Sequence, residues 1–218
     1  MDSFDDMLQF LDGQADIRKH GVKLPHWQQP GACTFVTFRL ADSIPREKLE
    51  IWKEEREEWL ERHPKPWNAD TEQTYHRQFS GQVERWLDES HGDCVLREPP
   101  VAADLAEVLG FHEPDRYLHH SWVIMPNHVH LLFTLHPEES LEDRLKNWKG
   151  ISARRINQRF GRNGKLWQRD YFDRLIRDGK HFRNVARYIR RNPEKARLGE
   201  GSYRLYESEL VKAMLDDE

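Results

Sequence analysis

The chain has 218 residues, 37% of them hydrophobic and 33% charged, which is typical of one globular domain with a single core. No apolar run approaches the roughly 18 residues that a membrane span needs. The acidic N-terminus, MDSFDDMLQFLDGQAD, is unlike an export signal. Cys33 and Cys94 lie far apart and outside any CxxC pair, which excludes a disulfide framework and a zinc knuckle. We therefore expect a cytoplasmic protein without a membrane address.

The net charge of -4 conceals a strong division along the chain. Residues 144–197 contain 18 Lys or Arg and 4 Asp or Glu, a balance of +14, whereas the remainder carries -18. Most charge runs are solvated helix faces, but here the single sign and the interleaved aromatic residues favour a surface that binds nucleic acid. Those aromatic residues are Trp148, Phe160, Trp167, Tyr171, Phe172, Phe182 and Tyr188.

The first part of the chain predicts an arm, a strand and a helix. Residues 1–30 mix an acidic stretch with glycines and prolines, which indicates a loosely attached arm. Residues 33–40, CTFVTFRL, alternate apolar and polar side chains as a half-buried strand does. Pro45 stands near the start of a helix that continues to about residue 63.

Two more helices are predicted before the middle of the chain. Pro64 and Pro66 end the preceding helix, and residues 74–90 then have their apolar side chains at helical spacing. A short helix over residues 101–109 follows the Glu98-Pro99-Pro100 break. We expect these middle helices to serve packing or partner contacts rather than chemistry.

The second half predicts a β-hairpin followed by a helix, a strand and a helix. Residues 117–125 and 128–135 form the hairpin. A helix over about 140–160, a strand over 166–177 and a helix over about 180–192, ending before Pro193, come next. This succession predicts an α+β fold in which helices cover an antiparallel sheet.

His128 and His130 stand two residues apart on a predicted strand. Their imidazoles therefore lie on one face of the sheet while Val129 faces the opposite layer. The pair suits the coordination of one metal ion by two histidine ligands. It is weak evidence by itself, because hydrogen-bonded and exposed histidines are common and this chain has 12.

Tyr188 and Asn192 lie one turn apart on the last predicted helix, so they are neighbours on its surface. The Asn192 amide oxygen is a candidate third ligand, and three neutral ligands would leave a divalent ion strongly electrophilic. Tyr188 is then a candidate nucleophile for a phosphodiester. The alternative is that Asn192 caps the helix and Tyr188 packs on the sheet.

Seven arginines are candidate DNA contacts, because guanidinium groups bind phosphates in two-pronged geometry. Some of them must face solvent, since every helix has an outer side. The seven are Arg154, Arg155, Arg169, Arg174, Arg187, Arg190 and Arg191.

Four motifs occur in a fixed order: VIMPNHVHLLF, KNWKGISARRIN, GKLWQRDYFDRLIR and HFRNVARYIRRNPEKARL. With them, residues 117–198, and more weakly 34–40, resemble the REP-associated tyrosine transposases of the IS200-like, single-tyrosine HUH superfamily. The resemblance implies a ferredoxin- or RRM-like HUH endonuclease core. It also implies that His128, His130 and Asn192 bind Mg²⁺ or Mn²⁺ and that Tyr188 is the catalytic nucleophile.

The resemblance further implies a substrate and a reaction. Such enzymes cleave single-stranded DNA at or beside hairpins of palindromic repeats, leaving a 5′-phosphotyrosine and a free 3′-hydroxyl. A protein of this kind would act in the bacterial cytoplasm, on the nucleoid when it is bound to DNA. Two alternatives remain: a domesticated module that binds structured DNA or RNA without turnover, and a metal-dependent phosphoesterase that uses water.

The same comparison predicts three segments. Residues 1–30 form the N-terminal arm and residues 31–200 the HUH transposase domain, with a helical insertion at about 64–114. Residues 201–218 form a C-terminal tail that is acidic at its end. The sequence leaves the choice between monomer and homodimer open.

Overall fold

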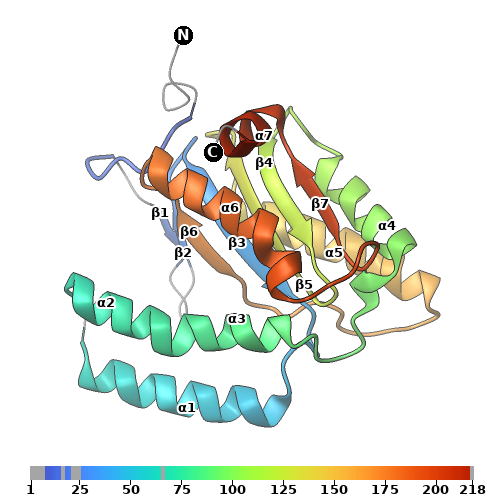
Figure 1. Ribbon diagram of the computed structural model, residues 1–218, viewed down its shortest axis with the longest axis horizontal. Helices are drawn as coiled ribbons and strands as arrows, with labels where there is room; N and C mark the ends of the chain where they lie inside the picture. The colour runs from blue at the N-terminus through green and yellow to red at the C-terminus, as the bar shows by residue number, and fades with distance from the viewer. Residues whose placement is uncertain (1–7, 16–17, 21–25, 65–66, 217–218) are drawn as a thin grey trace.

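A five-stranded antiparallel sheet forms the centre of the protein, with the strand order β6-β3-β5-β4-β7 (Figure 1). The computed structural model describes residues 8–15, 18–20, 26–64 and 67–216. Hydrophobic alternation predicted the two longest strands, which pair as a hairpin around Pro126 and Asn127. The strands are β3 (Cys33–Arg39), β4 (Tyr117–Ile124), β5 (His128–Leu135), β6 (Phe172–Leu175) and β7 (Arg204–Glu207).

Helices cover both faces of this sheet, which confirms the predicted α+β class. α4 (Pro99–Gly110) and α5 (Leu141–Arg159) lie on one face, and α6 (Gly179–Lys195) crosses the other (Figure 1). Helices separate β3 from β4 and β5 from β6, and the order β6-β3-β5-β4 is that of a ferredoxin-like βαββαβ unit. β7 extends that unit at the edge of β4.

Each face of the sheet has its own hydrophobic core. Val129, Leu131 and Phe133 of β5 lie in the cluster under α4 and α5. Leu132 points to the opposite cluster, which includes Ile189 of α6. The period of two therefore places His128 and His130 on the α6 side. Among the described helices, none is long and apolar enough to cross a membrane.

A helical arm, which we define as residues 46–64 and 67–88, stands beside the sheet (Figure 1). It consists of α1 (Arg46–Arg62), α2 (Ala69–Tyr75), a π-helical segment (His76–Ser80) and α3 (Gly81–Asp88). Phe79 is fully buried against Trp59 and Tyr75, with ring centroids 5.9 and 5.3 Å apart, and belongs to neither sheet cluster. The arm thus has a small aromatic core of its own.

Segments near both ends of the chain pack against the central sheet. β1 (Arg18–His20) pairs with β2 (His26–Gln28), and the amides of Leu11 and Cys33 bond to Ile176 O and Gln9 O, both at 2.8 Å. At the other end, α7 (Glu209–Asp216) buries Val211, Met214 and Leu215 in the α6-side core. The sequence analysis assigned no element there. The division into arm, domain and tail stays a prediction.

Two predicted elements differ from the structure. The strand predicted over 166–177 is regular only in β6, because Trp167 makes a single bridge with Leu40 and the residues between do not pair. The last helix does not end before Pro193 but continues to Lys195. Pro193 lies in the final turn, where it removes one amide donor, while its own carbonyl still accepts from Leu198 N at 2.9 Å.

His120, on β4, is a buried histidine whose charge should affect stability. Its Nε2 lies 2.8 Å from Thr134 Oγ1 and 3.7 Å from Cys33 Sγ. Burial, assisted by the neighbouring His119, lowers the pKa of His120 to about 4. Since the unfolded chain takes up this proton near pH 6.5, His120 destabilises the fold increasingly as pH falls from about 6.5 to about 4 and has no such effect above.

His120→Gln should therefore flatten the dependence of stability on pH in that window. Urea denaturation at pH 4.5 and pH 7.5 measures the loss of unfolding free energy, which should be smaller in His120→Gln than in wild type. His136→Gln, at an exposed histidine, is the matched control and should keep the wild-type loss. Equal losses in all three proteins would contradict the assignment.

Candidate functional site

His128 and His130 form a compact pair on β5. Their Nε2 atoms lie 3.1 Å apart, and the two side chains belong to residues that are only 1% and 2% exposed. The pairing of β3 with β5 sets Arg39 opposite His128 and Thr37 opposite His130. The strand register therefore fixes both what flanks the pair and which face it lies on.

The Nδ1 atom of each imidazole has a hydrogen-bond partner. His128 Nδ1 lies 2.8 Å from Asn127 Oδ1, and Asn127 Nδ2 donates to His91 O at 3.1 Å, which fixes the orientation of the amide. His128 therefore donates from Nδ1, and its Nε2 has a free lone pair when the ring is neutral. His130 Nδ1 lies 2.7 Å from Thr37 Oγ1, a hydroxyl that can donate or accept and so permits either tautomer of His130.

Both imidazoles are neutral near pH 7. Burial, assisted by the charge of Lys195, lowers the pKa of His128 to about 3. Burial also holds the pKa of His130 well below its ordinary value, with smaller contributions from His128 and Lys195. Neutral imidazoles with free Nε2 lone pairs are the form in which histidine binds metals.

Asn192 places an unsatisfied amide beside Tyr188, whose hydroxyl contacts His130. The residue lies in the last turn of α6 and is 1% exposed. Among the described residues, neither Oδ1 nor Nδ2 makes a hydrogen bond of acceptable geometry, although the amide is close enough to the Tyr188 hydroxyl to favour the ionised phenol. A buried amide without a partner costs about 1–3 kcal/mol. The position therefore suits a ligand that supplies the missing partner.

The donor set fits a divalent cation. Two ligands at right angles with bonds of about 2.1 Å lie about 3.0 Å apart, close to the 3.1 Å that separates the two Nε2 atoms. Within the described ranges no three His, Cys, Asp or Glu side chains converge to hold an ion, so the third protein donor here would be the Asn192 amide. The C-terminal end of a helix also favours positive charge.

Tyr188 lies on the same face of the sheet as the imidazole pair. Its hydroxyl is 3.4 Å from His130 Nε2, and its ring packs edge-on against Phe35 with centroids 6.0 Å apart. Burial raises the pKa of the phenol, and the charges of Glu84 and Asp88 on α3 raise it further. Tyr188 is thus a protonated phenol held against the imidazole pair.

The helical arm reaches this site through two polar contacts. Asp88 Oδ2 of α3 accepts from Lys195 Nζ at 2.9 Å, and Lys195 Nζ lies 5.8 Å from the centre of the Tyr188 ring. On the other side, Arg174 Nη2 of β6 lies 2.8 Å from His76 Nε2 in the π-helical segment. The arm therefore brings carboxylates close to a phenol that must ionise if it is to act as a nucleophile.

The structure brings His128, His130, Tyr188 and Asn192 together but distributes the seven candidate arginines over both faces of the sheet. Arg154 and Arg155 are exposed on α5, behind the sheet, and Arg155 pairs with Glu107 at 3.3 Å. Arg190 is engaged by Glu207 and Asp216, both at 2.8 Å. Arg169 and Arg191 are exposed, and Arg187 contacts Asn184 Oδ1 at 3.4 Å.

Several residues of the site escaped the sequence analysis. Thr37 and Arg39 occupy the polar positions of the alternating CTFVTFRL strand, so the period of two could have identified them. Lys195 continues the helical spacing of Tyr188 and Asn192. No sequence signal indicated that Glu84 and Asp88 of the helical arm approach Tyr188.

Residues 111–192 match the profile of a family described as "Transposase IS200 like". This segment contains the imidazole pair, Tyr188 and Asn192. No curated protein matches the chain.

Two solved structures match the chain at low sequence identity. One is a REP-associated tyrosine transposase bound to a REP hairpin, with 16% identity, a TM-score of 0.44, and coverage of 80% of this chain and 74% of that one. The other, provisionally assigned as a transposase, is from Deinococcus radiodurans R1, with 14% identity, a TM-score of 0.35, and coverage of 84% and 97%.

The carboxylates of α3 should control the ionisation of Tyr188. Combining Glu84→Gln with Asp88→Asn removes two negative charges near the phenol, so its pKa should fall. NMR of protein labelled at the tyrosine Cζ carbon measures this, with Tyr188→Phe to assign the resonance. The wild-type signal should titrate with a midpoint above the ordinary phenol pKa of about 10.

In the double variant the titration should begin at lower pH. Glu107→Gln, which removes a carboxylate on α4 behind the sheet, is the control and should leave the signal as in wild type. A wild-type midpoint at or below pH 10 would refute the assignment.

Proposed function

We propose that this chain, whose residues 111–192 match the profile of the IS200-like transposase family, is a metal-dependent single-strand DNA endonuclease and strand transferase. The observation that supports this most is the convergence of four groups on one spot. Two neutral imidazoles, a buried amide without a partner and a tyrosine hydroxyl 3.4 Å from His130 Nε2 meet there. The set combines the donors for a cation with a nucleophile for phosphorus.

His128 and His130 would bind a divalent ion through Nε2, and Asn192 would bind it through Oδ1. Asn127 and Thr37 orient the two rings by their contacts to Nδ1. Mg²⁺ or Mn²⁺ held by three neutral donors would act as a Lewis acid on a phosphate oxygen. These residues are thereby assigned to binding and orientation, and Tyr188 to bond formation.

In the proposed reaction the Tyr188 oxygen attacks the scissile phosphorus. The bond from phosphorus to the 3′-oxygen breaks, so the DNA 5′ end becomes linked to Tyr188 and a 3′-hydroxyl is released. The phenol loses its proton and the leaving oxygen gains one. Phe35 holds the ring in place, and Lys195 supplies positive charge close to it. The phosphotyrosine conserves the energy of the broken bond, so a 3′-hydroxyl can reverse the step.

The proposed substrate is single-stranded DNA at or beside a hairpin formed by a palindromic repeat, in the bacterial cytoplasm. Exposed cations, among them Arg169 and Arg191, would contact backbone phosphates. Arg154 and Arg155 lie behind the sheet, where they would meet only DNA that wraps around α5. Arg174, which contacts His76, would couple the helical arm to the strand bound at Tyr188.

The central experiment asks whether Tyr188 becomes linked to DNA. The protein is incubated with labelled hairpin oligonucleotides and Mg²⁺ or Mn²⁺, and a denaturant-resistant adduct is sought by electrophoresis. Wild type should form the adduct and Tyr188→Phe should not, because only the phenol oxygen can bond to phosphorus. Tyr171→Phe is the control and should leave the adduct intact.

Three results would change the proposal. Equal adduct in wild type and Tyr188→Phe would show that Tyr188 is not the nucleophile. Salt-sensitive binding without cleavage over many hairpins and both metals would favour a non-catalytic module for structured DNA or RNA. Cleavage that leaves no protein linkage and ignores Tyr188 would indicate a phosphoesterase that uses water.

The metal assignment has its own test. Combining His128→Ala with His130→Ala should abolish cleavage and weaken Mn²⁺ binding, measured by electron paramagnetic resonance or calorimetry, because two of three protein donors are lost. DNA affinity should fall by less than about tenfold, since phosphate contacts come from Lys and Arg. His136→Ala is the control. Unchanged Mn²⁺ binding in the double variant would overturn the assignment.

A further inference from the structure

Arg39 is a cation on the imidazole face of the sheet that the proposed reaction does not use. Val36, Phe38 and Leu40 of β3 and its end lie in the core under α4 and α5. The alternate residues Thr37 and Arg39 therefore belong to the opposite face, and Arg39 pairs with His128 in the β3–β5 register. Arg39 thus lies on the strand next to the one that carries His128 and His130.

The guanidinium of Arg39 is partly buried without an ion-pair partner among the described residues. Its Nη1 donates to Ser43 Oγ at 3.0 Å and to Leu40 O at 3.4 Å, two neutral acceptors. Asp170 acts on Arg39 only at longer range. Burial lowers the pKa of Arg39 to about 10. Removing a charge from water is costly unless an opposite charge compensates it, so the position is suited to an anion.

Two lysines add to this charge at the same end of the sheet. The loop that follows α5 is attached to the end of β3, since Gln168 N donates to Arg39 O at 2.9 Å. Burial lowers the pKa of Lys149 on α5 to about 8, and the positive charges of Lys165 and Arg39 lower it further while Asp170 opposes them. Lys149 therefore lies close enough to Arg39 and to Lys165 to be repelled by both, and Asp170 is the carboxylate that acts on both Arg39 and Lys149.

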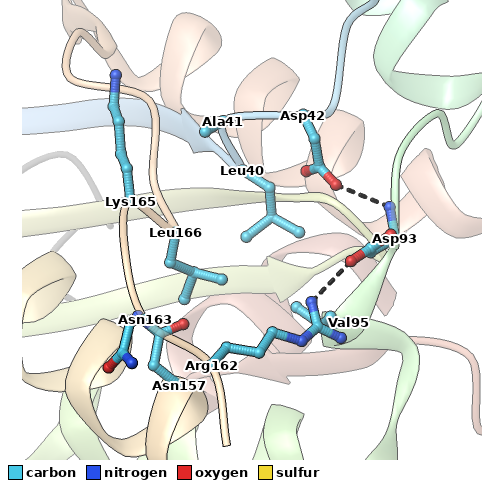
Figure 2. Close-up of a pocket in the computed structure, with 10 residues that line it drawn as sticks. All are labelled: Leu40, Ala41, Asp42, Asp93, Val95, Asn157, Arg162, Asn163, Lys165 and Leu166. Atoms are coloured by element: carbon cyan, nitrogen blue, oxygen red, sulfur yellow. Dashed lines mark hydrogen bonds and ion pairs between the residues drawn. The ribbon is translucent and has the colours of Figure 1, made fainter. Parts of the chain in front are cut away.

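Arg162, on the same loop as Lys165, is compensated. Arg162 pairs with Asp93 at 2.7 Å across a cavity of about 160 Å³ beside Leu40 (Figure 2). The side chain of Lys165 extends away from that ion pair (Figure 2). Arg162 therefore adds no uncompensated charge to that of Arg39, Lys149 and Lys165.

We propose that Arg39, assisted by Lys149 and Lys165, binds the backbone phosphate next to the scissile one in the single-stranded segment of the DNA. The single-stranded DNA would pass from Tyr188 across the imidazole pair and then past the end of β3. A phosphate there relieves the repulsion of Lys149 by Arg39 and Lys165 and gives the guanidinium a charged acceptor. This inference rests on the proposed function for the identity of the strand.

The test combines a protein change with a change at single phosphates. Binding is measured in the Tyr188→Phe background with hairpin oligonucleotides in which one phosphate at a time is an uncharged methylphosphonate. Arg39→Gln should weaken binding of the unmodified DNA by about 10- to 100-fold and reduce the salt slope by about one ion. With the methylphosphonate at the contacted position, Arg39→Gln should cause no further loss.

Matched variants separate this contact from general effects. Arg62→Gln, at the distant end of α1, removes one exposed charge and should change affinity by less than about twofold, uniformly over all phosphates. Arg39→Lys keeps the charge and should recover part of the affinity. Thermal denaturation of each variant identifies any that fail to fold. Lys149→Gln, measured with the same methylphosphonate, then provides a second combination of protein change and phosphate change.

The outcomes distinguish this inference from the proposed function. A single phosphate at which the Arg39→Gln loss disappears supports it, even if wild type forms no covalent adduct. If Arg39→Gln loses the same affinity whichever phosphate is replaced, or loses none, the inference is overturned even if the Tyr188 adduct forms. Absence of any DNA binding by the parent protein overturns both.

Discussion

The site depends on the burial of two uncharged imidazoles with their Nε2 atoms 3.1 Å apart. Two protonated rings at this distance inside the protein would repel each other strongly, so the arrangement requires both to be neutral. Asn127 and Thr37 each bind an Nδ1 atom and leave the Nε2 atoms converging. Because these contacts come from β3 and from the β4–β5 turn, the central strands of the sheet hold the site together.

Tyr188 is governed by the opposite requirement. A nucleophilic phenol must ionise, yet burial and the α3 carboxylates raise its pKa. Lys195 places a positive charge close to both, since it pairs with Asp88 and also lies 5.8 Å from the centre of the Tyr188 ring. In the absence of DNA the environment therefore favours the protonated, unreactive phenol. A cation at the imidazole pair would favour the ionised phenol, so under the proposed function Tyr188 would react only when the site is occupied.

The sequence was informative where one local period determined the result. The alternation of β5 placed His128 and His130 on one face, and the helical repeat placed Tyr188 beside Asn192. The sequence could not show that Asn192 lies inside the helix, because Pro193 suggested that the helix ends before it, whereas the last turn continues to Lys195. It also could not place the helical arm, whose contacts join residues about a hundred positions apart, such as His76 and Arg174.

The basic segment illustrates why charge must be considered in three dimensions. Arg190, inside that segment, is compensated by carboxylates of β7 and α7, and Arg155 pairs behind the sheet. Arg39, outside the segment, lies beside the imidazoles with no ion pair in the described part of the chain. A count along the sequence gives cations equal weight, whereas affinity for a polyanion depends on those that the fold leaves uncompensated. Because the fold pairs off many of them, a few residues such as Arg39 can decide where a phosphate chain lies on a protein of net charge -4.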